Sequence, residues 1–364
     1  MTLLDTLTAP EAPRAPISIA IGPWNVGPVQ EVGAFSSGQL QLTLDQGHQL
    51  TFNMPGRSPA ARLSDGLTTD VWLSIDEGLA GRFRMLPLTQ TWGPNGEDDV
   101  SVQAVSYKRL LAWRFLHAAL SYTQIDQGDI IWNLIAHAQA QTGGSLGITK
   151  GSAATGVLRD RLYAIGDNVL DLGTNMSGVE NGCWWDIDEA NVYTAHQYST
   201  FPLNPTPLVL GANALSLVRT PSTAFANAVM ASGDQAATTP VWVQATTVGT
   251  DPRGRWEAVF SSPSTIVQAT LTEQAKGHLN RTGKPAATWT ADIEPHRWRA
   301  DSHYEPGDRI TVIIPPDTAD VIGPPQGSVQ CQLTEVAASF DNHGALAITI
   351  TATEGLAAVP SEVT

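Results

Sequence analysis

The chain has 364 residues, which is enough for two or three domains that each bury a core. Its 20 basic and 35 acidic side chains give a formal charge of −15, and this balance excludes a protein that holds DNA through its phosphates. No apolar stretch approaches the ~20 residues that cross a bilayer, and no basic residue precedes Arg14, so we expect neither a signal peptide nor stable membrane insertion. We therefore expect a product that is made and folded in a cytoplasm.

Charged residues make up only 15% of the chain, whereas eleven residues are Trp. The centre of a permanent interface is poor in charge and rich in aromatic side chains, so this composition suits a protein that assembles with others. Ordinary use of Trp in buried cores explains the same numbers equally well. Composition leaves both interpretations open.

The first 112 residues predict a β module. Residues 1–15 are rich in Pro and Ala and predict an extended arm. Beyond them apolar and polar residues alternate, as at Leu40 and Leu42, and turns such as Gln46-Gly47 interrupt the pattern, which is typical of half-buried strands. Strands are predicted at residues 17–21, 39–44, 48–54, 70–75, 81–89 and 100–104.

Residues 113–200 change period and predict an α/β insert. Asp126 can cap a helix whose apolar residues fall on one face and which we expect Gly143 to end. A second helix is predicted near residues 167–176, followed by a hairpin in residues 183–196.

The remaining chain predicts a second β module that one helix interrupts. Residues 201–262 open this module with a Pro-rich extended linker and then strands. Residues 263–284 predict the helix, because apolar residues recur at spacing four from Val267 onward. Residues 285–355 complete the module, and residues 356–364 form a short tail.

A strand and a hairpin of the first module return in the second. In both copies every second residue is apolar, as Phe83 and Met85 show in the first and Val329 and Cys331 in the second. The fold class predicted is therefore mainly β with an α/β insert, with two related antiparallel β-barrel-like modules in one chain. The corresponding segments are DVWLSI from Asp70 and DRITVI from Asp308, GRFRMLPLT from Gly81 and GSVQCQLTE from Gly327, and the strands after the turns Asn95-Gly96 and His343-Gly344.

One pair of carboxylates is the best candidate for chemistry. Asp186 and Asp188 alternate on one predicted strand, so they share a face at a separation of roughly 6–7 Å. That spacing resembles the acid and base of a glycoside hydrolase, and the adjacent Trp184 and Trp185 could stack a sugar. The solvated face of an ordinary hairpin explains the pair more simply.

Metal and cofactor motifs are missing from the sequence. His296 and His303 are close in sequence, but no carboxylates or cysteines at ligand spacing accompany them, so surface histidines are the simpler explanation. Cys183 and Cys331 lie far apart and do not suggest a disulfide framework. We expect no catalytic residue, no cofactor and no metal, and hence a protein that is not an enzyme.

The order of the segments resembles that of the tail-tip (baseplate) hub proteins of long-tailed bacteriophages, often called minor tail proteins in phages of actinobacteria. The resemblance covers roughly residues 15–355, and its order is more specific than any single motif. The segments that carry it are TTDVWLSIDEGLAGRFR, SYKRLLAWRFL, DIIWNLIAHAQ, RDRLYAIGDNVLDLG, NGCWWDID, AFANAVMASG, TIVQATLTEQAKGHL and YEPGDRITVII.

This resemblance implies a structural protein of the virion, located at the tail tip. It implies a homotrimer in which two related modules per chain form a ring of pseudo-sixfold symmetry that continues or closes the tail tube. The implied partners are the distal tail or tube-end protein, the tape measure protein and further tail-tip or fibre proteins, with genomic DNA passing only in transit.

From the net charge we hypothesise that the bore is acidic and repels DNA, so that basic residues along it would contradict the idea. Two alternatives remain from the residues alone. One is a cell-wall glycan hydrolase that uses Asp186 and Asp188. The other is a carbohydrate-binding virion protein that uses Trp184 and Trp185.

Overall fold

The structure is a computed structural model of the chain. It describes residues 17–75, 78–93, 98–201, 203–221, 225–233, 242–247, 254–261, 268–283, 287–294, 304–314, 327–342 and 345–354. The turns Asn95-Gly96 and His343-Gly344 lie outside these residues.

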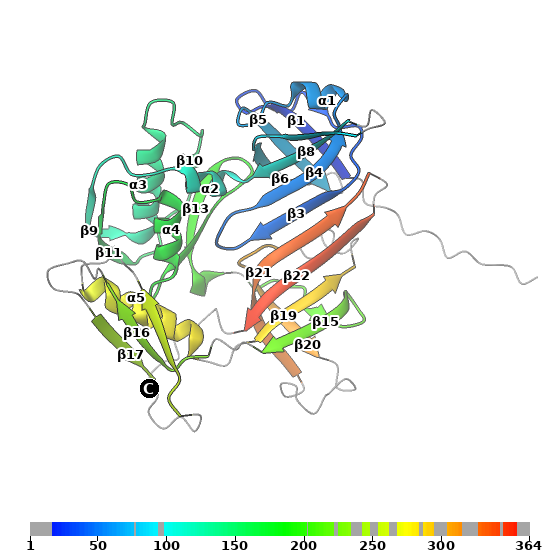
Figure 1. Ribbon diagram of the computed structural model, residues 1–364. Coiled ribbons are helices and arrows are strands. Elements are labelled where there is room, and N and C mark those ends of the chain that lie inside the picture. Colours follow the sequence, from blue (N-terminus) through cyan, green and yellow to red (C-terminus); the bar gives the residue numbers. More distant parts are fainter. Residues whose placement is uncertain are drawn as a thin grey trace, which may run out of the picture.

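One sheet of fourteen mostly antiparallel strands dominates the molecule, and it contains strands from both the N-terminal and the C-terminal part of the chain (Figure 1). The main strand order is β15-β19-β22-β21-β3-β4-β8-β6-β5-β1-β2, with β7 on β8, and with β20 on β14 and β21. Its N-terminal strands are β1 (Ile17–Pro23), β2 (Gln30–Glu31), β3 (Gly38–Thr43), β4 (Gln49–Pro55), β5 (Thr69–Ile75), β6 (Gly78–Met85), β7 (Thr89–Trp92) and β8 (Asp98–Val105). Its C-terminal strands are β14 (Leu208–Val209), β15 (Ala214–Pro221), β19 (Ala287–Ile293), β20 (Arg309–Ile314), β21 (Gly327–Phe340) and β22 (Leu346–Glu354). The predicted fold class is confirmed: the chain is mainly antiparallel β, and the sheet curls into a half-barrel.

One apolar core lies under this sheet and is shared by both copies. The alternation seen in the sequence determines which side chains enter it, because Leu40, Leu50 and Phe52 are buried and their neighbours are not. Ile348 and Ile350 of β22 belong to the same core. A short helix, α1 (Pro59–Leu63), begins at Ser58, whose hydroxyl accepts a hydrogen bond from the amide of Ala61. No helix was predicted for this segment from the sequence.

Five strands of each copy follow the same path, which confirms the duplication. Strands β3, β4, β8, β6 and β5 pair in that order, and β15, β19, β22, β21 and β20 repeat it, all antiparallel. Phe52 opposes Val102 in the first copy as Ala291 opposes Ile350 in the second, and all four are buried. The copies differ beyond these strands, because β1 is antiparallel to β5 whereas β14 is parallel to β20.

The insert forms a separate unit with its own core. Its elements are α2 (Tyr107–Leu110), the 3-10 turn η1 (Leu111–Trp113), β9 (Leu120–Asp126), α3 (Gln127–Gln139), β10 (Thr149–Lys150), β11 (Leu158–Tyr163), α4 (Val169–Ser177), β12 (Cys183–Ile187), β13 (Val192–Gln197) and the 3-10 turn η2 (Tyr198–Thr200). Asp126 caps α3 as predicted, since its carboxylate accepts the Gly128 amide. The helix α3 ends at Gln139, before Gly143, and α4, predicted from about residue 167, begins at Val169 with Asn168 as its cap.

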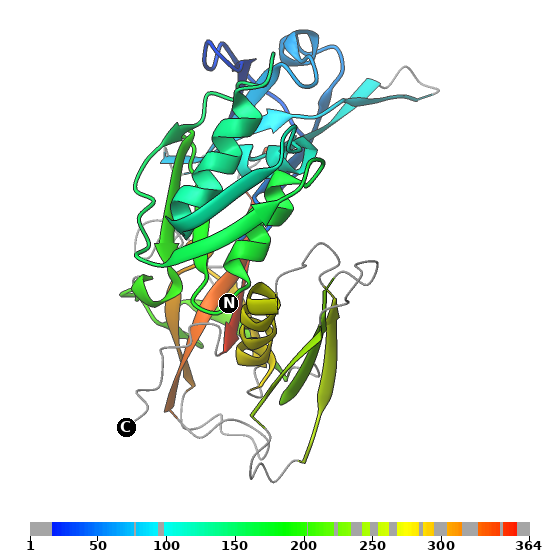
Figure 2. The ribbon, with the colours of Figure 1, turned by 90° about the vertical axis from the view of Figure 1, so that its left-hand side faces the viewer.

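A third unit consists of the three-stranded sheet β17-β16-β18 and the helix α5 (Gln268–Thr282), which Figure 2 shows beside one another. The strands are β16 (Ala228–Ser232), β17 (Trp242–Thr246) and β18 (Glu257–Ser261). The helix buries Leu271, Ala275 and Leu279 against Val229 and Ala231 of β16. The sequence analysis counted these strands with the second β module, but they form a sheet of their own. Within the described residues no helix is long and apolar enough to span a membrane.

Candidate functional site: a polar sheet face and the joints that hold it

The two copies are joined by pairing of β3 with β21, two strands from opposite ends of the chain. Leu40 opposes Ala338 and Gly38 opposes Phe340 in an antiparallel register. Gly38 leaves room for the Phe340 ring as it stands in this joint, because a Cβ atom there would lie 2.1 Å from the ring. Phe340 also packs edge-on against Phe35, at 5.9 Å between ring centroids. The joint makes one continuous sheet out of two modules.

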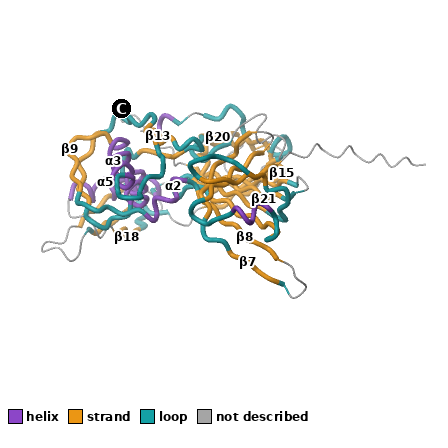
Figure 3. Tube along the Cα trace, turned by 90° about the horizontal axis from the view of Figure 1, so that it is seen from above, coloured by secondary structure: helices purple, strands orange, loops and turns teal. Residues whose placement is uncertain are grey.

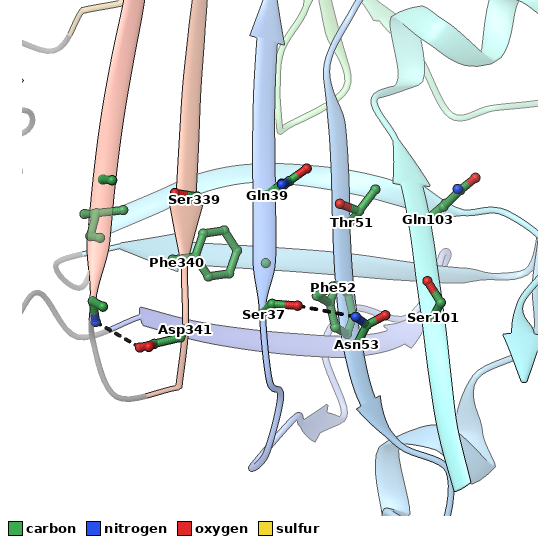
Figure 4. A pocket seen from close by; sticks show the side chains of 14 residues that line it. Ser37, Gln39, Thr51, Phe52, Asn53, Ser101, Gln103, Ser339, Phe340 and Asp341 are labelled. Carbon is green, nitrogen blue, oxygen red and sulfur yellow. Dashed lines mark hydrogen bonds between the residues drawn. The ribbon is translucent and has the colours of Figure 1, made fainter. Parts of the chain in front are cut away.

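The joined strands present a face of small polar side chains on the side away from the core. One row crosses five strands as Gln103, Thr51, Gln39, Ser339 and Ala347 (Figure 4). We call this surface the polar face and define it by the following residues of β8, β4, β3, β21, β22, β19 and β15: Ser101, Gln103, Thr51, Asn53, Gln39, Gln41, Thr43, Glu335, Ala337, Ser339, Ala347, Thr349, Thr351, Thr290, Asp292, Ser216 and Val218. A hollow of about 660 Å³ lies over part of it.

Charge on the polar face is sparse and acidic. Glu335 and Asp292 are its charged members, and it contains neither Lys nor Arg. Gln41 donates a hydrogen bond of 2.7 Å to Glu335 across the joint. Hydroxyl groups of Ser216 and Thr349 donate to Asp292, and these bonds lower the pKa of its carboxyl below the ordinary value. A surface of this kind offers hydrogen bonds to water but no cation for a phosphate.

A buried lysine fixes the insert to the first module. Lys108 of α2 is almost fully buried, and its ammonium donates to the carbonyl oxygens of Leu44 at 2.9 Å and of Trp185 at 2.7 Å. The ammonium also lies 4.6 Å from the centre of the Trp185 ring. Burial lowers the pKa of Lys108, and Asp186 opposes that effect. Because Leu44 follows β3 and Trp185 belongs to β12, this one side chain ties the two units together.

The predicted carboxylate pair has structural roles in this arrangement. Asp186 Oδ2 lies 3.5 Å from His48 Nε2, and Asp186 Oδ1 lies 3.9 Å from Lys108 Nζ. Burial alone would raise the pKa of Asp186, but Lys108 and His48 hold it below the ordinary value. Asp188 stands in the β12–β13 turn, where its Oδ1 accepts the amides of Ala190 and Val192. The two carboxylates therefore have separate roles: Asp186 lies beside Lys108 and His48, and Asp188 accepts backbone amides of the turn.

The two tryptophans do not form a common stacking platform. Successive residues of a strand face opposite sides, and Trp185 accordingly enters the insert core with 1% of its surface exposed. Trp184 packs on the other side against His196 and Phe201. A sugar could reach Trp185 only if the core opened. This geometry does not favour the carbohydrate hypotheses.

Other predicted positions carry no site in the described residues. His296 and His303 lie outside the described residues, and within them no group of three His, Cys, Asp or Glu side chains could hold a metal. Cys183 and Cys331 are free and buried, and burial raises the pKa of each thiol to about 12, which makes both unreactive.

The sequence analysis missed one charged cluster in the first module. Asp70 of β5 is fully buried and bonds to Arg82 at 2.7 Å and Arg84 at 2.6 Å. The Tyr107 hydroxyl donates to Asp70 at 2.7 Å, and burial with the adjacent carboxylate raises the pKa of Tyr107 to about 12. Two arginines at alternate positions of a strand were the available signal, but they carry no information about the partner.

No protein-family model matches this sequence, and neither does any curated protein sequence. Solved structures do match, and they define the fold as that of tail proteins. The tail protein from Neisseria meningitidis MC58 aligns with a TM-score of 0.64 and 12% identity over 93% of this chain and 96% of that one. The 43 kDa tail protein of prophage MuSo2 from Shewanella oneidensis aligns with a TM-score of 0.64 and 11% identity over 94% and 99%.

A third solved structure links the fold to a secretion machine. It is an E. coli component of the type VI secretion system that is described as similar to the T4 bacteriophage tail proteins gp27 and gp5. It aligns with a TM-score of 0.52 and 12% identity over 88% of this chain and 73% of that one. At these identities the likeness concerns the fold.

Proposed function

We propose that this chain is a structural protein of a bacteriophage tail, and that it forms the hub at the tail tip. The observation that carries this proposal is the five-strand path that occurs twice and is joined into one sheet through β3 and β21. A chain with two equivalent modules can present six similar faces as a trimer, which suits a ring that continues or closes a sixfold tube. The shared fold with solved tail proteins supports the same role.

In this assembly the polar face lines the bore through which DNA passes. Side chains such as Gln39, Thr51 and Gln103 remain hydrated and offer no positive charge to the phosphates. The two acidic residues of the face, Glu335 and Asp292, add weak repulsion. The proposal therefore differs from the hypothesis based on net charge in that it expects a nearly neutral bore in place of an acidic one.

The other elements of the proposal concern place and partners. The chain belongs to the virion and contacts the tube-end protein, the tape measure protein and further tail-tip or fibre proteins. The insert, predicted at residues 113–200 and beginning with α2 in the structure, faces outward and offers surface to those neighbours. Residues 1–112 and 201–355 supply the two modules, with the unit that contains α5 as an appendage of the second.

The test is the mass and shape of the purified protein. Sedimentation analysis should give three times the 38.7 kDa chain mass, and electron micrographs should show a ring with a central hole. A chain that stays monomeric both alone and with its tube-end protein would refute the ring.

A further inference from the structure

Strand β21 has two different partners along one of its edges. Its first half, Gly327–Gln332, pairs with β20, and its second half, Glu335–Phe340, pairs with β3 of the other module. The opposite edge is covered by β22 from Cys331 onward. The second half of β21 is therefore the strand that receives the neighbouring module.

In the first module, two separate strands, β6 and β7, correspond to the first and the second half of β21. Strand β6 pairs with β5 as the first half of β21 pairs with β20. Strand β7 pairs with β8 as the second half of β21 pairs with β22. Among the described residues, no strand pairs with the other edge of β7. Figure 3 shows β7 projecting from the main body of the molecule.

The last residue of β7, Trp92, is a large aromatic residue that is mostly exposed to solvent in the single chain. Trp92 opposes Asp98, four positions before Val102, as Phe340 opposes Leu346, four positions before Ile350. Trp92 is thus the counterpart of Phe340. Phe340 is 4% exposed in the joint with β3, whereas Trp92 is 70% exposed. The indole at this core position is left in water because none of the described strands covers it.

The counterpart of β3 also has an unpaired edge. Strand β15 pairs with β19 as β3 pairs with β4, and within the described residues no strand pairs with its outer edge. Leu217 corresponds to Gly38, since it opposes Ala291 as Gly38 opposes Phe52. Val218 of this edge strand is 54% exposed. Such an edge invites pairing unless something covers it.

We propose that β7 of one copy pairs, antiparallel, with β15 of a neighbouring copy, and that this joint repeats the internal joint between β21 and β3. The proposal rests on the ring proposed above and specifies the strands that close it. Leu217 of the neighbouring copy occupies the position of Gly38, and because it has a side chain there, Trp92 packs beside it in a rotamer different from that of Phe340. The register follows from the internal joint: Trp92 opposes Leu217, Thr91 opposes Val218, Gln90 opposes Arg219 and Thr89 opposes Thr220 of the neighbour.

Internal and external joints then alternate around the ring. A head-to-tail contact of this kind gives a closed ring if its rotation closes and a filament if it does not. Three chains contribute three internal and three external joints of the same design. The polar face, which crosses the internal joint from β8 to β15, would continue across each external joint.

Disulfide cross-linking tests the register directly. The double variant with Thr91→Cys and Val218→Cys places two thiols directly opposite each other between copies. Opposed Cβ atoms of neighbouring strands lie about 4.5–5.5 Å apart, so a small adjustment reaches the Cβ separation of about 3.5–4.5 Å found in a disulfide. Mild oxidation should give covalent species that end at the trimer. Six strands separate β7 from β15 within one chain, which opposes an intramolecular bond. The native Cys183 and Cys331 are buried and should not take part.

Matched controls define the alternatives. Thr91→Cys with Ser216→Cys moves the second thiol two positions along the same face, which is too far for a disulfide without a slip in register. A trimer by sedimentation that gives no cross-link with Val218→Cys would overturn the strand joint while leaving the ring intact. A ladder beyond the trimer would support the joint and contradict the threefold ring. A monomer without cross-links at the highest soluble concentration would overturn both.

Substitution of the exposed indole supplies an independent measurement. Trp92→Ala should weaken self-association at least about tenfold, as expected for a central aromatic residue of an interface. Trp113→Ala is the matched control, because Trp113 is also more than half exposed but lies on η1 and not on either edge strand. Unchanged association of Trp92→Ala would count against the joint.

Discussion

Replacement of the two hairpin carboxylates separates a structural role from a catalytic one. If Asp186 and Asp188 were the acid and base of a hydrolase, Asn at either position would abolish cleavage with little effect on folding. The structure instead predicts unequal effects on stability. Asp186→Asn removes the charge beside Lys108 and His48, whereas Asp188→Asn keeps the oxygen that accepts the amides of the turn.

The magnitude follows from the geometry of Lys108. Loss of one partner of a fully buried ion pair costs about 3–5 kcal/mol. Here the pair is long, at 3.9 Å, and the side chain of Asp186 is 18% exposed, so water screens it in part. We therefore expect Asp186→Asn to lower the free energy of unfolding by about 1–3 kcal/mol, and Asp188→Asn by less than about 0.5 kcal/mol.

Urea unfolding followed by tryptophan fluorescence measures both free energies. The same measurement at several pH values tests whether the contribution of Asp186 to stability falls at low pH. The folded-state pKa of Asp186 lies below its ordinary value, so its contribution is complete above the ordinary carboxyl pKa and is lost as the pH falls through the lower folded value. The difference between wild type and Asp186→Asn should therefore shrink as the pH falls below the ordinary carboxyl pKa of about 4. Equal costs for the two variants, or a difference that does not depend on pH, would refute the role given to Lys108.

Three further predictions concern the core, the joint and the bore. Asp70→Asn should cost about 3–5 kcal/mol, because the buried Arg84 and the partly buried Arg82 lose their counter-ion, and chemical unfolding measures it; a cost below about 1 kcal/mol would contradict the cluster. Gly38→Val should cost about 1–3 kcal/mol of folding free energy, because the valine side chain would meet the Phe340 ring. A Tm equal to that of wild type would contradict the register of the joint. The wild-type protein should not bind duplex DNA at physiological salt, whereas Gln39→Lys with Thr51→Lys should bind in fluorescence anisotropy with an affinity that falls as salt rises. Salt-dependent binding by the wild type would contradict the proposed bore.

Local elements were largely accessible from the sequence because their signals lie within a few residues. Alternation at Leu40 and Leu42 predicted β3, and Asp126 predicted the start of α3. The end of α3 was less well predicted, since Gly143 stands beyond the last helical turn. The duplication was recognised, but its register was displaced. In the first pair of segments the displacement is one residue, because Asp70, which opposes Arg84, corresponds to Arg309, which opposes Gln332, and not to Asp308. In the second pair it is two residues, because Phe83 corresponds to Cys331 and not to Val329.

The sequence predicted which side chains of the polar face point away from the core, but it did not predict which strands are neighbours. Alternation places Gln39, Thr51 and Gln103 on the solvent side of their strands, but it does not say that these strands are neighbours of β21. The hydrogen bond from Gln41 to Glu335 joins residues 294 positions apart. Pairing of segments so distant leaves no local trace, because any two alternating strands can in principle form a ladder.

Sequence by itself determined the strands, the principal helices and the presence of two similar copies, since each depends on periodicity and on residues that cap or turn the chain. Tertiary structure alone decided that the copies share one sheet and that β16 to β18 form a separate unit with α5. It also decided that Asp186 lies beside Lys108 and does not form a pair with Asp188. It also decided that Phe340 is covered while its counterpart Trp92 is exposed. The physical reason is that burial and charge pairing depend on which distant segments meet, and only the folded chain brings those segments into contact.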